Sequence, residues 1–218
     1  MLRRDLALLV AGLLFSRSAA AADVAAGLTE ALVVGTDRTV DRLGKPGGFL
    51  NDPKARIPLP GPLEKARTAL KAVGLSGAAD DLEVRMNKAA EEATPIAKNL
   101  IVEAIHGLTF EDAMGILNGP KDSATRYLER KTGPSLSKQM RPIVDHALAD
   151  VGAIKSFDSV VSSYKSLPFG SSLNIDLTGY VVSGAQKAIF MYIGQEEAAI
   201  RTNPAARTTA LLKSVFGG

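Results

Sequence analysis

The spacing of apolar residues constrains this chain most, because it follows a helical period over nearly the whole sequence. Apolar residues recur every three or four positions, which places them on one face of an α-helix. The period-two alternation of a half-buried strand is scarce, and runs of β-branched residues are short. A chain of 218 residues also fits one domain. We therefore expect an all-α protein.

The periodic segments predict a single-domain bundle of eight or nine helices. Thr109, Asp122 and Asp176 occupy N-cap positions, and an acidic first turn follows Thr109. Between 79 and 107 the apolar stripe continues through Pro95, where we expect a kink or a break because proline removes a backbone hydrogen bond. The predicted helices cover 23–43, 62–74, 79–107, 109–118, 122–132, 135–150, 154–166, 175–202 and 204–216.

One segment breaks the helical pattern. Residues 44–62 read GKPGGFLNDPKARIPLPGP and hold five of the eleven prolines and four glycines. A long loop in a compact domain is usually functional or disordered. Phe49, Leu50, Ile57 and Leu59 are apolar anchors that a disordered linker rarely carries. We expect an ordered strap across the helices; a solvated linker is the alternative.

The first 22 residues have the pattern of an export signal. Two arginines are followed by a ten-residue apolar run and then by alanines that offer an A-x-A cleavage site before Asp23. The apolar run is too short to span a bilayer. We expect residues 1–22 to be a signal peptide that is removed, leaving 23–218 as one all-α domain in the periplasm. A buried N-terminal helix is the alternative.

Charge is nearly balanced overall but unevenly distributed. The net charge is +3, and removal of residues 1–22 would leave +1, so there is no electrostatic footprint for nucleic-acid binding. Residues 38–71 have a net charge of +5, and residues 80–112 have −5. The two blocks either face each other as ordinary solvated surfaces, or the basic block forms an anion-binding surface around the strap.

The residue inventory excludes several kinds of chemistry. There is no cysteine and there are only two histidines, so thiol nucleophiles and the usual zinc sites are ruled out. No nucleophile elbow, phosphate loop, dinucleotide fingerprint or zinc-protease motif occurs. A calcium-loop-like stretch at 174–185 ends in alanine instead of the bidentate glutamate. We expect no catalytic constellation, no metal and no cofactor.

The last long helical segment carries an unusual carboxylate. At 100° per residue, Glu196 and Asn203 fall within the apolar stripe, whereas Glu197 points to the polar side. A carboxylate on a buried face has to be paired, because an unpaired buried charge is costly. The stripe consists of Val181, Ala185, Ala188, Ile189, Tyr192, Ala199 and Ile200.

Arginine is the expected partner of Glu196, because its planar fork matches a carboxylate. Arg207 is the first choice, followed by Arg56 of the strap and Arg126. We expect Glu196→Ala to be strongly destabilising and Glu197→Ala to be tolerated. The group is either a buried ion pair that fixes helix packing or a polar ligand site. The candidate ligand-binding residues are Arg56, Arg126, Glu196, Asn203 and Arg207.

Four motifs, taken in order, resemble a known family. They are GFLNDPKARIPLP in the strap, the turn ILNGPKDSATRYL, the segment RPIV at 141–144 and the ending EEAAIRTNPAARTTALLKSVF. Together they resemble the bacterial family called domain of unknown function 4197, over about residues 24–216. The resemblance implies an exported, mostly helical protein. It implies no activity, cofactor or catalytic residue.

The predicted function is that of an exported, non-enzymatic periplasmic protein that binds a ligand or interacts with the envelope. Helical bundles hold ligands between helices, in pockets with a few convergent polar groups. The expected partner is an anionic or acyl small molecule or an envelope protein. One alternative is a carboxylate-dependent, hydrolase-like enzyme with Glu196 as general acid or base. The other is a structural or chaperone-like envelope factor.

The export signal makes a direct prediction. Protein recovered from the cell envelope of the source organism should begin near Asp23, which mass spectrometry of the intact chain would measure. Recovery of cytoplasmic chain that still begins at Met1 would contradict the signal peptide.

Overall fold

The computed structural model describes residues 25–203 and residue 213, and within this part of the chain the regular structure is entirely helical. Seven helices and no strand occur there, which confirms the all-α class. The first helix covers 25–43. The others are α2 (Gly61–Lys71), α3 (Gly77–His106), α4 (Phe110–Leu117), α5 (Ser123–Asp150), α6 (Ala153–Lys165) and α7 (Leu177–Thr202).

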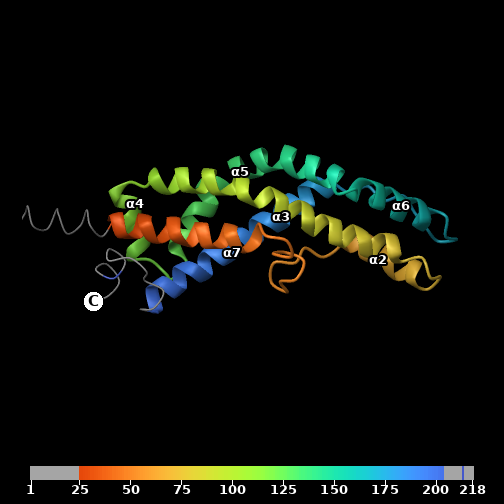
Figure 1. Cartoon of the computed structure of the whole chain (residues 1–218), viewed down its shortest axis with the longest axis horizontal. Helices are drawn as coiled ribbons and strands as arrows, with labels where there is room; N and C mark the ends of the chain where they lie inside the picture. The colour runs from red at the N-terminus through yellow and green to blue at the C-terminus, as the bar shows by residue number, and fades with distance from the viewer. Residues whose placement is uncertain (1–24, 204–212, 214–218) are drawn as a thin grey trace, which may run out of the picture.

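Helix α3 is the centre of an elongated bundle (Figure 1). It packs against α5, α6, α7 and α2. At one end of the bundle α2 and α6 lie beside the N-terminal part of α3 and contact each other. Towards the other end α7 packs on α5, and the helix over 25–43 lies against α7, where a Cβ on Gly35 would stand 3.1 Å from the Cβ of Glu196. The long helices therefore join all parts into one bundle.

The centre of α3 is built from small residues, which lets the neighbouring helices approach closely. Helices α5, α6 and α7 pack around α3 and contribute larger apolar side chains to the same core. The fully buried alanines of α3 are Ala79, Ala89, Ala90, Ala93 and Ala97.

Two of the predicted helix starts are confirmed in atomic detail. The Thr109 hydroxyl accepts a hydrogen bond from the Asp112 N–H at 3.1 Å, and the Asp112 carboxylate accepts one from the Thr109 N–H at 3.1 Å. This reciprocal pair is a capping box that starts α4. The Asp176 carboxylate likewise accepts from the Gly179 N–H at 2.9 Å at the start of α7. Residues within three positions of each helix start therefore determine where α4 and α7 begin.

The described residues form seven helices, whereas the predicted ranges place eight there and a ninth over 204–216. Residues 122–132 and 135–150 belong to one continuous helix, α5, which contains Pro134 and Pro142. An unbroken buried row runs across the Gly133–Pro134 pair, and its packing outweighs the lost backbone hydrogen bond. The row consists of Leu128, Thr132, Leu136, Met140 and Val144.

Helix α3 does not break at Pro95 either. It continues from Gly77 to His106 with the proline inside it. The buried residues Ala93 and Ala97 on either side of Pro95 hold both halves of the helix in the same core. Apart from residue 213, which is helical, the predicted helix over 204–216 lies outside the described residues.

Helix α5 is capped by a carboxylate from α7. Asp122 stands at the N-cap but makes no side-chain cap bond. Instead the Glu197 carboxylate accepts hydrogen bonds from the N–H groups of Ala124 at 3.2 Å and Thr125 at 3.0 Å, and from the Thr125 hydroxyl at 2.8 Å. Arg201, one turn further along α7, donates to the same carboxylate at 3.0 Å. Glu197 therefore satisfies the helix start with a negative charge, where the helix dipole favours one.

The expectation that Glu196 is the buried carboxylate is therefore wrong. Glu197 is 5% exposed. Glu196 is about one-third exposed and pairs with Arg38 at 3.1 Å. The prediction from the apolar stripe assumed that this helix buries a single face. The C-terminal half of α7 is instead covered on two sides, by α5 and by the helix over 25–43. The buried arc is therefore wider than the apolar stripe and includes Glu197 at its α5 edge.

The two adjacent glutamates give a matched test of this geometry. Glu197→Ala should lower the free energy of unfolding by about 3 kcal/mol, because it leaves two helix N–H groups without their acceptor and removes the carboxylate that pairs with the largely buried Arg201. Glu196→Ala removes an ion pair whose two side chains are each about one-third exposed, and should cost no more than about 1 kcal/mol. Urea unfolding of both variants measures the difference. Equal losses, or a larger loss for Glu196→Ala, would contradict the assignment.

Candidate functional site

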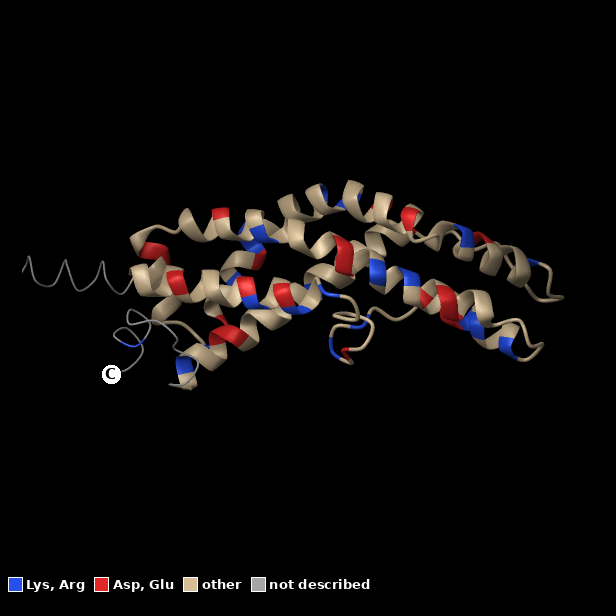
Figure 2. Cartoon of the chain, in the orientation of Figure 1, with Lys and Arg blue, Asp and Glu red and all other residues tan. Residues whose placement is uncertain are grey.

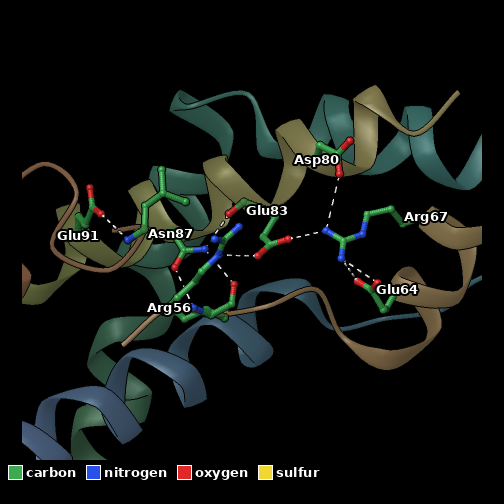
Figure 3. A network of polar contacts seen from close by, with 9 residues as sticks. Arg56, Glu64, Arg67, Asp80, Glu83, Asn87 and Glu91 are labelled. Carbon is green, nitrogen blue, oxygen red and sulfur yellow. Dashed lines mark hydrogen bonds and ion pairs between the residues drawn. The ribbon is translucent and has the colours of Figure 1, made fainter. Parts of the chain in front are cut away.

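Three polar residues on one face of α3 hold the segment between the first helix and α2. We call this segment, residues 44–60, the central loop. Glu83, Asn87 and Glu91 are spaced four residues apart, so their side chains line up along the helix and point at the loop (Figure 3). Their exposed fractions are only 6%, 0% and 6%. A buried row of this kind needs partners, and the central loop provides them.

Glu91 binds the backbone at the start of the central loop. Its carboxylate accepts hydrogen bonds from the N–H groups of Gly47 at 3.1 Å, Phe49 at 3.0 Å and Leu50 at 3.2 Å. Gly47 has a φ of +80°, a conformation that favours glycine. Because of this turn, the N–H groups converge on one anion while the side chain of Phe49 is fully buried. Glu91 thus fixes the loop where it leaves the first helix.

Asn87 binds the far part of the loop through one residue. Its Oδ1 accepts from the Ile57 N–H at 2.8 Å, and its Nδ2 donates to the Ile57 carbonyl at 2.9 Å. The same Nδ2 donates to the Glu83 carbonyl of its own helix at 2.8 Å. The Ile57 side chain then packs on Gly184 of α7, where an added Cβ would stand 2.9 Å from it. Any larger residue at 184 would push Ile57 and the loop away from α7.

Glu83 accepts from two arginines, one on each side. Arg56 of the central loop donates to it at 2.8 Å, and Arg67 of α2 donates at 2.8 Å (Figure 3). Arg67 also pairs with Glu64 at 2.7 Å. The basic block at 38–71 therefore meets the acidic block at 80–112 in part, as one of the two sequence interpretations expected.

Asp52 ties the loop to α7 and to the first helix. The Tyr192 hydroxyl donates to its carboxylate at 2.6 Å, and Arg42 donates to it at 2.8 Å. Arg42 also lies over the Tyr192 ring, 4.2 Å from the centroid. Burial by itself raises the pKa of Asp52, but the hydrogen bonds from Tyr192, Arg42 and the Lys54 N–H outweigh it and lower the pKa to about 2. Asp52 is therefore a fixed anion with its charge already balanced.

A groove of about 790 Å³ lies beside this group. It is bounded by the end of the first helix, the central loop and α7. Three cations, Arg42, Lys45 and Lys54, and one anion, Asp52, line it, which gives the wall a net charge of +2. Within the part of the chain that the structure describes, neither lysine forms an ion pair. The lining residues are Arg42, Lys45, Pro46, Gly47, Gly48, Asn51, Asp52, Pro53, Lys54, Tyr192 and Gln195.

A second, smaller hollow of about 290 Å³ lies on the other side of Lys54. Arg56 and Lys187 contribute basic groups, and Ile57, Pro58 and Met191 contribute apolar surface. Lys54 borders both hollows, so the central loop separates two basic depressions along α7. We refer to the larger one as the basic groove.

Comparison with known proteins places the chain in a family. The model of the family described as "Protein of unknown function (DUF4197)" matches residues 18–217. The chain belongs to the DUF4197 family. No curated protein and no solved structure gave a match. The family description states no activity, so the function of this DUF4197 protein has to be argued from its own residues.

The structure of this DUF4197 protein separates the residues predicted to form one site. Arg56 pairs with Glu83, Arg126 pairs with Asp122 at 2.7 Å, and Glu196 pairs with Arg38. Asn203 is exposed at the end of α7. Arg207 lies outside the described residues. Among the four of these residues that the structure describes, Arg56 alone borders a hollow beside the central loop. Binding of a ligand at these residues stays a prediction.

Sequence reasoning missed the row Glu83–Asn87–Glu91 and the pair Asp52–Tyr192. The row had a readable signal, since three polar residues recur every fourth position beside the apolar stripe of the same helix. The pair had none, because the two residues are 140 positions apart. Over the residues described, no cluster of three or more acidic or histidine side chains could hold a metal ion. The described helices also include none with the length and apolarity needed to cross a bilayer.

The Asp52–Tyr192 hydrogen bond predicts a pH effect. Because the folded-state pKa of Asp52, about 2, lies below its ordinary value of 3.8, the carboxylate contributes stability above pH 3.8 that is lost as the pH falls towards 2. Tyr192→Phe should raise the pKa of Asp52, reduce stability at neutral pH by about 1 kcal/mol, and reduce the loss on acidification.

An NMR titration of the Asp52 carboxyl carbon and urea unfolding at several pH values measure these effects. Tyr180→Phe is the matched control, since Tyr180 is on the same helix and, within the described part of the chain, makes no hydrogen bond to Asp52. An unchanged Asp52 pKa in Tyr192→Phe would refute the role given to the hydroxyl.

Proposed function

We propose that this DUF4197 protein is an exported, non-enzymatic binding protein that holds an anionic small molecule in the basic groove. The observation that carries the proposal is the pair of exposed lysines, Lys45 and Lys54, which line one groove and face no acidic partner among the described residues. Lysines placed in this way offer two point charges to a carboxylate or phosphate group.

The surrounding structure supports the proposal because it is already rigid. Asp52 has its hydrogen bonds filled by Tyr192 and Arg42, so it does not compete for the lysines. Glu91 anchors the loop between Lys45 and Lys54, and Asn87 anchors it three residues after Lys54. A loop fixed in advance loses little conformational entropy on binding. In this proposal the central loop is the strap expected from the sequence, and it serves to present Lys45 and Lys54.

Export is the second part of the proposal. It rests on the basic start, apolar run and alanine-rich end of residues 1–22. A periplasmic binding protein would account for both the export signal and the basic groove. Neither alternative function gains a supporting observation: Glu196, the proposed acid or base of a hydrolase, is paired with Arg38. A purely structural factor would not require two lysines without acidic partners to line the same groove.

Two lysine-to-serine double variants test the groove. Titration calorimetry with inorganic pyrophosphate, and separately with succinate, distinguishes a phosphate site from a carboxylate site. Lys45→Ser with Lys54→Ser should weaken binding of the preferred anion at least about tenfold, and the wild-type affinity should fall as salt is added. Lys121→Ser with Lys138→Ser, which removes the same charge from exposed positions on another face, is the matched control.

Native mass spectrometry of the protein purified from its own cell envelope then identifies the natural ligand. An anion that co-purifies with wild type and is absent from the groove variant would support the proposal. It would be refuted if neither probe bound and nothing co-purified, or if the control variant lost binding as much as the groove variant.

A further inference from the structure

Two chain turns lie at one end of the elongated bundle (Figure 1). One joins α2 to α3 over residues 72–76, and the other follows α6 at residues 167–170. Helices α2 and α6 pack against each other and point the same way, so both turns lie at the same end of the molecule (Figure 1). This end is far from α4, which closes the opposite end of the bundle.

Large apolar side chains protrude from these turns into solvent. Phe169 is 96% exposed, and Val73 and Leu75 are each 55% exposed. Six large hydrophobic residues are exposed in the described part of the chain, and three of them lie here. We call Val73, Leu75 and Phe169 the apolar tip. Apolar groups gathered at one exposed end of a protein commonly mark a contact with a membrane or another protein.

Backbone hydrogen bonds close both turns, so the turn geometry itself places these apolar side chains in solvent. The Leu75 N–H donates to the Leu70 carbonyl at 2.9 Å, and Gly74 adopts a φ of +77°, as in a glycine-terminated helix. The Gly170 N–H donates to the Leu167 carbonyl at 2.9 Å, and an added Cβ on Gly170 would clash with the Tyr164 carbonyl. A turn closed in this way holds Phe169 outward at its apex.

The charges in the last turns of α2 and α6, beside the apolar tip, are positive, while the Asp80 carboxylate of α3 accepts a hydrogen bond from the Ser76 hydroxyl of the turn between α2 and α3. Lys71 lies in the last turn of α2, and Lys165 lies in the last turn of α6. Residues 68–79 and 159–175 contain these two lysines and no aspartate or glutamate. Figure 2 shows the acidic residues of α2, α3 and α6 set back from the end. Lysines behind exposed apolar groups can reach phosphate headgroups while the apolar groups enter the bilayer interface.

We propose that the apolar tip docks the protein on the surface of an anionic lipid bilayer, with Phe169, Leu75 and Val73 entering the interface and Lys71 and Lys165 contacting headgroups. The tip consists of separate protrusions at the narrow end of the bundle. A lipid surface deforms around such protrusions, whereas a protein partner would need matching cavities for each of them. Two nearby lysines also select for anionic lipid.

The absence of tryptophan from the sequence permits a sharp test. Phe169→Trp introduces a single tryptophan at the apex of the tip, and Phe110→Trp introduces one at α4, where Phe110 is 50% exposed at the opposite end of the bundle. Vesicles of phosphatidylglycerol mixed with phosphatidylcholine should shift the emission of Phe169→Trp to the blue and allow brominated lipid to quench it. The Phe110→Trp emission should not change.

Co-sedimentation with the same vesicles measures the binding itself. Leu75→Ser with Phe169→Ser should weaken binding at least about tenfold. Lys71→Glu with Lys165→Glu should weaken binding to the anionic vesicles to the same extent, but should not weaken binding to vesicles of phosphatidylcholine alone. Phe110→Ser and Lys121→Glu are the matched controls and should bind like wild type. These side chains are exposed, so thermal unfolding should show all variants to be folded.

Three results would overturn the proposal. The first is a Phe169→Trp emission that does not respond to vesicles or responds no more than that of Phe110→Trp. The second is loss of vesicle binding in the Lys45→Ser, Lys54→Ser variant with retention in the tip variants, which would assign lipid binding to the basic groove. The third is dimerisation without vesicle binding, seen by light scattering and removed by Phe169→Ser, which would make the tip a contact between two copies.

Discussion

The hydrogen bonds between α3 and the central loop are the interactions on which the rest of the structure depends. The backbone hydrogen bonds within the loop do not use the N–H groups of Phe49, Leu50 and Ile57, yet Phe49 and Ile57 are buried in the core. Glu91 and Asn87 supply the missing partners at both ends of the loop. With the loop in place, Asp52 meets Tyr192, and Lys45 and Lys54 come to line one groove.

Two buried glutamates solve the same physical problem in different places. Glu91 receives three N–H groups of the central loop, and Glu197 receives two from the start of α5. In each case an anion is stabilised by aligned backbone dipoles from a segment distant in sequence. Each carboxylate thereby holds together two elements that are far apart in the sequence. Burying charge in this bundle thus serves to fix the register between helices and loops.

The basic groove and the apolar tip occupy different parts of the bundle. The groove lies where the central loop crosses α7, and the tip lies where α2 and α6 end (Figure 1). A protein docked on a bilayer by its narrow end would keep the groove open to solvent along its side. The two proposals rest on separate residues, so each can fail without the other.

The sequence by itself determined the helical class, the helix starts at Thr109 and Asp176, and the two opposite charge blocks. Each of these depends on residues within four positions of one another, or on composition. The tertiary structure alone decided the continuity of α5 through Pro134, the choice of Glu197 over Glu196 as the buried carboxylate, and the meeting of Asp52 with Tyr192. These depend on which elements cover each face of a helix. Periodicity gives the direction of a side chain, but the number of neighbours decides how wide a face is buried.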